Sequence, residues 1–207
     1  AQLMQEVGPN KVVKLAQAMG IRQSTLEAVP SLALGTSPVT LMEMVAAYGT
    51  IANGGRYLAP VMVTRIEDRN GKVVEEFAPA DAEQALSDDV AYTLLDTMRG
   101  VINRGTGSAI RSRFGIRADV AGKTGTTQDN ADGWFLLMHP QLVAGAWAGF
   151  NDGRVTLRSD YWGQGAHSAL PIVGDFFNNA LRNRLIDRNA RFEAPDETGF
   201  LQRTFRQ

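Results

Sequence analysis

Lys123, Thr124, Gly125 and Thr126 bring a cation, two hydroxyls and a glycine together in a stretch that is typical of a β-strand. Successive side chains of a strand point to opposite faces, so Lys123 and Gly125 would share one face and the two threonines the other. Gly125 has no side chain, which lets a ligand or another backbone come close. Hydroxyl donors, a positive charge and an accessible amide N–H suit a substrate carboxylate and a developing oxyanion. The alternative is the polar end of an ordinary edge strand.

A phosphate-binding loop is the other motif that these residues suggest. Gly122, Lys123 and Thr124 match the end of the pattern Gly-x-x-x-x-Gly-Lys-[Ser/Thr]. The first glycine of that pattern would fall at position 117, which is Arg117. The helix that should follow the lysine is replaced by turn residues over 125–133. Both mismatches exclude a nucleotide-binding loop.

Composition limits the kinds of partner. The chain has 207 residues, is 44% hydrophobic and has a net charge of −1, which is typical of a globular domain and does not favour broad contact with nucleic acid. The absence of cysteine excludes disulfides and thiolate metal sites and fits an exported protein. We expect packing or turn roles for the two histidines, His139 and His167, and no metal or cofactor. No apolar run reaches about 20 residues, so any membrane anchor would lie outside this chain.

Apolar residues at helical spacing, together with capping and stop signals, predict helices over residues 9–19, 40–53, 87–103 and 168–184. Thr40 and Glu43 have the spacing of a capping box. An Asn-Gly turn between residues 61–67 and 72–77 predicts a hairpin, which we expect to pack on the surface of the domain. Residues 105–107, Gly-Thr-Gly, predict a tight turn near the site.

The strand that contains Lys123 is followed by two apolar runs, at 134–138 and 142–149, with a short turn between them. Three strands joined by turns predict an antiparallel meander. The apolar runs are almost continuous, so helices should cover both faces of the sheet. The fold class is therefore α+β, an antiparallel sheet flanked by helices.

Several sequence blocks in a fixed order resemble the transpeptidase domain of class A penicillin-binding proteins. The resemblance extends from about Ala1 to Leu181. Its blocks are KTGTT at 123–127, WF at 134–135, GAWAGF at 145–150, PSLALGTSPVT at 30–40, Tyr48 with IANGG at 51–55, Pro60, and RGTG at 104–107. The resemblance implies the penicillin-binding protein and serine β-lactamase fold, incomplete in this chain.

This family uses three catalytic motifs, Ser-x-x-Lys, Ser-x-Asn and Lys-Thr-Gly, and the sequence contains only the third. None of its serines has Lys three positions later or Asn two positions later. By resemblance, Lys123 supplies positive charge and a hydrogen bond toward the serine of the second motif. Thr124 and Thr126 bind the terminal carboxylate of a D-Ala-D-Ala stem peptide or of a β-lactam. Gly125 and Thr127 complete the substrate-binding set, and Thr127 also supports the end of the strand. The backbone N–H of Thr126 forms half of the oxyanion hole.

The resemblance implies a peptidoglycan D,D-transpeptidase of the bacterial cell envelope, on the extracytoplasmic (periplasmic) face of the inner membrane. Residues 1–187 would be the C-terminal part of the transpeptidase domain, and residues 188–207 a charged tail. Leu3, Met4 and Val7 form an apolar helical face, but no capping residue precedes it. We therefore expect this sequence to be part of a longer polypeptide. The partners would be stem peptide, β-lactams and the N-terminal half of the same domain, which carries the nucleophile; the isolated chain should be inactive. The alternatives are a D,D-carboxypeptidase or β-lactamase-like hydrolase, and a non-catalytic half-domain that binds peptidoglycan or a partner protein.

Overall fold

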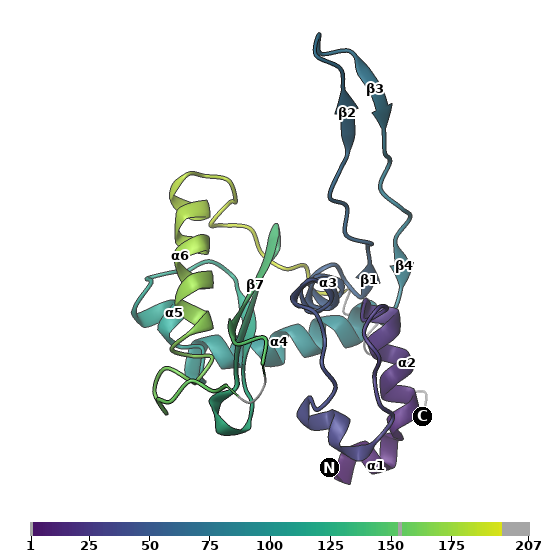
Figure 1. Ribbon diagram of the computed structural model, residues 1–207. Coiled ribbons are helices and arrows are strands. Elements are labelled where there is room, and N and C mark those ends of the chain that lie inside the picture. The colour runs from purple at the N-terminus through teal and green to yellow at the C-terminus, as the bar shows by residue number, and fades with distance from the viewer. Residues whose placement is uncertain (1, 153–154, 196–207) are drawn as a thin grey trace.

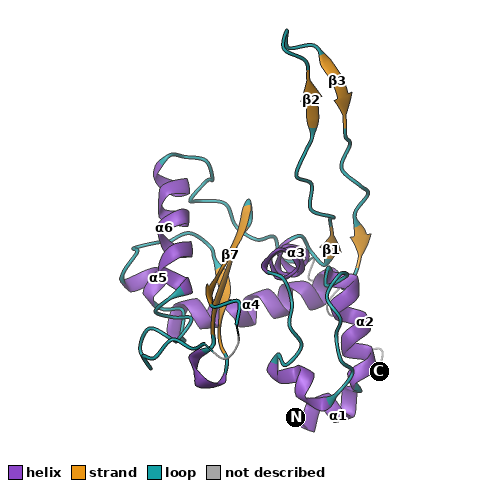
Figure 2. Cartoon of the chain, in the orientation of Figure 1, coloured by secondary structure: helices purple, strands orange, loops and turns teal. Residues whose placement is uncertain are grey.

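The computed structural model describes residues 2–152 and 155–195, and an antiparallel sheet lies at its centre (Figures 1 and 2). Its strands are β5 (Ala121–Thr126), β6 (Asp132–His139) and β7 (Leu142–Gly149), in the order β5-β6-β7. Thr124 lies opposite Phe135, which in turn lies opposite Ala146. The predicted antiparallel meander is confirmed.

Helices cover the two faces of this sheet, as predicted. Phe135 points to the face where α6 (Ala169–Arg182) packs, in a cluster with Leu170 and Phe177. The next residue, Leu136, points to the other face, where it approaches Gly145 and α3 (Leu41–Ala52). The long helix α4 (Asp88–Arg104) runs along β5 and contributes side chains to the hydrophobic clusters of both faces.

The segment before α3 contains α1 (Gln2–Val7), α2 (Pro9–Met19) and the 3₁₀ turn η1 (Pro30–Leu34). Pro9 stands in the first turn of α2, and Gly20 ends it with a positive φ of 129°. The predicted capping box at the start of α3 is confirmed, with reciprocal hydrogen bonds between Thr40 and Glu43. The buried Glu43 carboxylate also accepts hydrogen bonds from Gln23 N–H, Ser24 N–H and the Ser24 hydroxyl. This one side chain therefore anchors the long loop after α2 to α3.

The predicted hairpin is formed by β2 (Arg65–Glu67) and β3 (Val73–Glu76), but its expected position was wrong. It projects away from the body of the molecule, and all residues of both strands are exposed (Figure 1). The reason is that its short strands give neither face a continuous apolar surface. A second short pair, β1 (Arg56–Tyr57) with β4 (Glu83–Gln84), joins the base of the hairpin to the domain.

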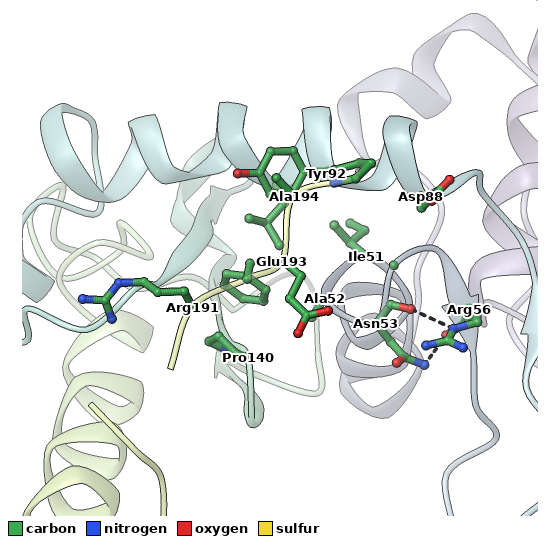
Figure 3. A pocket seen from close by; sticks show the side chains of 14 residues that line it. Ile51, Ala52, Asn53, Arg56, Asp88, Tyr92, Pro140, Arg191, Glu193 and Ala194 are labelled. Carbon is green, nitrogen blue, oxygen red and sulfur yellow. Dashed lines mark hydrogen bonds between the residues drawn. The ribbon is translucent and has the colours of Figure 1, made fainter. Parts of the chain in front are cut away.

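The segment after α6 packs back on α3 and α4. Phe192 contacts the cluster that contains Leu95, and its N–H donates to Asp119 Oδ2 at 3.0 Å. Arg99 of α4 completes the contact with a 2.7 Å ion pair to Asp119. A cavity of about 400 Å³ lies between residues 191–195 and the ends of α3 and α4 (Figure 3). Most of the predicted charged tail, residues 196–207, lies outside the described residues.

Candidate active site

Strand β5 forms one edge of the three-stranded sheet, and its hydrogen bonds show which backbone groups face outward. Thr127 N–H donates to Asp132 O at 3.1 Å, so this pair is hydrogen-bonded across the strands. Hydrogen-bonded and non-bonded pairs alternate in an antiparallel ladder, so the N–H groups of Thr124 and Thr126 point away from β6. In agreement, Thr124 O also faces the open edge and accepts a hydrogen bond from Lys123 Nζ at 2.6 Å. The edge therefore presents Thr126 N–H beside the Lys123 ammonium.

The side chains of β5 alternate between the two faces, as the sequence predicts. Lys123 is exposed and lies on the face of α3, because its partner Leu136 points there. Thr124 is buried and lies on the face of α6, like its partner Phe135. Its Oγ1 lies 2.6 Å from Thr106 Oγ1, in the turn that follows α4. The predicted turn at 105–107 therefore does lie beside the strand.

Thr126 is exposed at the end of β5, and the loop between β7 and α6 contacts it there. Gly165 N–H donates to Thr126 Oγ1 at 3.1 Å. A side chain at position 165 would overlap the carbonyl oxygens of Gly125 and Trp134, so only glycine can come this close. Further along the same loop, His167 stacks on Tyr161 with ring centroids 3.8 Å apart. This loop therefore lies directly against the Lys-Thr-Gly strand.

A small hydrogen-bond network holds the end of the strand. Asp132 N–H donates to Thr127 Oγ1 at 2.9 Å, and Thr127 Oγ1 lies 3.2 Å from Asp132 Oδ2. Trp147 Nε1 on β7 donates to Asp132 Oδ1 at 2.6 Å. The network links all three strands immediately after Thr126, and gives Thr127 contacts that suit its expected supporting role. Asp132 was not anticipated from the sequence.

His139 lies at the opposite end of the sheet from Thr126. It is buried, and its Nδ1 accepts a hydrogen bond from Gln141 N–H at 3.2 Å. Burial lowers its pKa, with opposing effects from nearby acidic groups, so the imidazole is favoured in its neutral form. These contacts agree with a packing role. Among residues 2–152 and 155–195, no cluster of three or more His, Cys, Asp or Glu could hold a metal ion.

Three hollows in the described part of the chain are lined by residues other than Lys123, Thr124, Gly125 and Thr126. The widest, about 770 Å³, lies beside α3 and is mainly apolar. It is lined by Leu41, Met42, Val45, Ala46, Gly49, Asn53, Arg56, Leu58, Ala59, Pro60 and Val143. The outward groups of β5 lie at the edge of the sheet, where no further strand pairs with them among the described residues.

The comparisons with known proteins match this strand edge and the elements around it. The family model "Penicillin binding protein transpeptidase domain" matches residues 1–139. The chain belongs to the penicillin-binding protein transpeptidase domain family. No helix among the described residues has the length and apolar character needed to cross a membrane.

Penicillin-binding protein 2D of Bacillus subtilis (strain 168) is 37% identical to this chain over 183 residues, which cover 85% of the chain and 25% of that protein. Penicillin-binding protein 1A of Haemophilus influenzae has the same fold, with a TM-score of 0.83 and 22% identity over 95% of this chain and 34% of its own. PonA1 of Mycobacterium tuberculosis in complex with penicillin V has a TM-score of 0.71 and 25% identity, covering 95% of this chain and 56% of its own. The chain thus spans about a quarter of the length of its curated relative.

Proposed function

We propose that this chain supplies the carboxylate-binding and oxyanion-binding strand of a serine D,D-transpeptidase that cross-links peptidoglycan in the bacterial cell envelope. The observation that carries the proposal is the outward direction of Thr126 N–H at the open edge of β5, beside Lys123. A backbone N–H fixed by a sheet is preorganised for an oxyanion and needs no rearrangement during the reaction. Membership of the transpeptidase family and the likeness to PonA1, whose structure holds penicillin V, support the same assignment.

In this mechanism the nucleophilic serine and its lysine base come from another part of the polypeptide, because the sequence has no Ser-x-x-Lys. The serine oxygen attacks the carbonyl carbon of the penultimate D-Ala and passes its proton to the base. Thr126 N–H and the nucleophile's own N–H stabilise the negative oxygen of the tetrahedral intermediate. The C–N bond then breaks, the terminal D-Ala leaves as an amine with the returned proton, and an ester remains on the serine. Attack on this ester by the amine of a second stem peptide forms the cross-link.

The same proposal assigns an occupant to the apolar hollow beside α3. Val45 and Val143 line this hollow, which lies on the face to which Lys123 points. The lining of this hollow is mainly apolar, which suits a surface that another part of the protein covers. We propose that the N-terminal half of the transpeptidase domain packs here and carries the nucleophile to the open edge of β5. Lys123 would then exchange its contact with Thr124 O for the serine of the second motif.

The replacement Thr126→Val in the complete protein tests the role of the strand. Valine keeps the shape and the backbone N–H but removes the hydroxyl, so acylation by a penicillin with a free carboxylate should fall. Loss of a hydrogen bond to a charged group is worth about 1.5–3 kcal/mol, or about 10- to 100-fold in rate. A penicillin whose carboxylate is amidated should be affected much less. Equal losses with both compounds, measured as second-order acylation rates, would remove the assigned role.

A further inference from the structure

A third hydroxyl, that of Thr106, lies beside the Thr124 hydroxyl of β5. Its turn is held tightly, because Gly105 N–H and Gly107 N–H both donate to Val101 O, at 3.1 and 3.0 Å. A Cβ at Gly105 would lie 2.9 Å from that same oxygen, and a Cβ at Gly107 would lie 2.8 Å from Ile102 Cδ1. Gly105 leaves no room for a side chain against the Val101 backbone, and Gly107 packs closely on Ile102, so the turn that carries Thr106 is closely packed.

The hydroxyls of Thr124 and Thr126 already use part of their hydrogen-bond capacity within the protein. The oxygen of Thr126 accepts from Gly165 N–H, which leaves its own proton free to be donated elsewhere. Thr124 and Thr106 share one hydrogen bond between two hydroxyls, so one proton of this pair is also left over. Which hydroxyl keeps the free proton depends on the direction of the Thr106–Thr124 bond.

The two hydroxyls differ in burial. Thr124 is only 8% exposed, and within the described residues Thr106 is the hydrogen-bond partner of its hydroxyl. When a carboxylate is bound, only donation from Thr106 to Thr124 gives the buried Thr124 hydroxyl both a donor and an acceptor. Thr106 is exposed, and water can satisfy its remaining acceptor capacity. With Thr106 as donor, the Thr124 proton is released toward a ligand.

We propose that Thr106 is a positioning residue that donates its hydroxyl proton to Thr124, so that Thr124 and Thr126 each offer a proton to the substrate carboxylate. Two donors then match the two oxygens of one carboxylate, and both hydroxyls are oriented before the substrate arrives. Residues two apart on a strand lie about 6.6 Å apart, a span that a carboxylate with a hydrogen bond at each oxygen can cover. This inference rests on the proposed function and extends it to a residue outside the Lys-Thr-Gly strand.

The test uses the full-length protein that contains this chain, with the replacements Thr106→Val and Thr106→Ser. Second-order acylation rates are measured with a penicillin that has a free carboxylate and with its amidated form, and thermal unfolding is recorded for each variant. Thr106→Val should lower acylation by the free carboxylate about tenfold and by the amide less than about twofold, because one hydrogen bond loses its orientation. Thr106→Ser should restore the rate. Thr97→Val is the matched control, because Thr97 is exposed and its hydroxyl donates within α4 to Thr93 O at 2.9 Å.

A selective loss in Thr106→Val that serine restores supports the proposal. An unchanged rate, or an equal loss with both penicillins, overturns it. If Thr106→Val unfolds at a lower temperature, the smaller Thr106→Ala is measured in the same way and must show the same selectivity. Failure of the proposed function is distinguished by Thr126→Val: if that variant is selective and Thr106→Val is not, only the role of Thr106 is wrong.

Discussion

Replacing Glu43 by glutamine should make the domain less stable at neutral pH and remove a specific part of its sensitivity to acid. The Glu43 side chain is 4% exposed, and such burial by itself would raise its pKa. The hydrogen bonds from Ser24, Gln23 and Thr40 outweigh burial and lower the pKa from 4.5 to about 2. A difference of this size corresponds to about 3 kcal/mol of stability.

The sign of this contribution follows from the direction of the pKa shift. The carboxylate is favoured in the folded state, so its contribution is complete above pH 4.5 and is lost as the pH falls toward about 2. The free energy of unfolding should therefore differ between wild type and Glu43→Gln by up to about 3 kcal/mol at pH 7, and the difference should shrink on acidification. Urea unfolding of the transpeptidase domain at a series of pH values measures it.

The control for the loss of one negative charge is Glu75→Gln, which changes an exposed carboxylate of the projecting hairpin. The carboxylate explanation would be refuted if the difference in unfolding free energy between wild type and Glu43→Gln stayed constant from pH 7 to pH 2. It would also be refuted if Glu75→Gln had the same effect, because the stabilisation would then come from net charge and not from the hydrogen bonds of Glu43.

Two further replacements test contacts around the sheet. Asp132→Ala should lower acylation by penicillin, because it removes the carboxylate that binds Thr127 and Trp147 and holds the strand directly after Thr126; stopped-flow acylation measures the loss, about tenfold or more. An unchanged rate would show that the strand end needs no such support. Asp119→Ala should lower the free energy of unfolding by about 3 kcal/mol, because it removes the main partner of Arg99. The Arg99 side chain is only 18% exposed, so water replaces that partner poorly. Denaturant unfolding measures the loss. Asp96 is an exposed partner of the same arginine, so Asp96→Ala should cost less. An equal loss of stability in the two variants would contradict the prediction that the buried ion pair matters more.

The elements that could be predicted are those whose signals are local in the sequence. The Thr40–Glu43 capping box sits within one helical turn, and Gly20 ends α2 directly after its last apolar residue. The faces of Lys123 and Thr124 follow from the two-residue period of a strand. The directions of the β5 side chains could therefore be predicted before the structure was known.

The contacts that the sequence could not predict join segments far apart in the chain. Thr106 meets Thr124 across 18 positions and Gly165 meets Thr126 across 39. The glycines on either side of Thr106 were the only local signal for the first contact, and they indicated a turn without its partner. The projecting position of the hairpin was missed for a related reason, because an Asn-Gly turn specifies the pairing of two strands and not what they pack against.

The most direct test of the central claim is intact-mass spectrometry under denaturing conditions, with and without penicillin, followed by peptide mapping. The complete protein should gain the mass of one drug molecule, and the adduct should map to a serine outside residues 1–207. A polypeptide of residues 1–207 alone should stay unlabelled, because its sequence has no Ser-x-x-Lys to supply the nucleophile. A stable adduct on any serine within residues 1–207 would show that the nucleophile does not come from another part of the polypeptide.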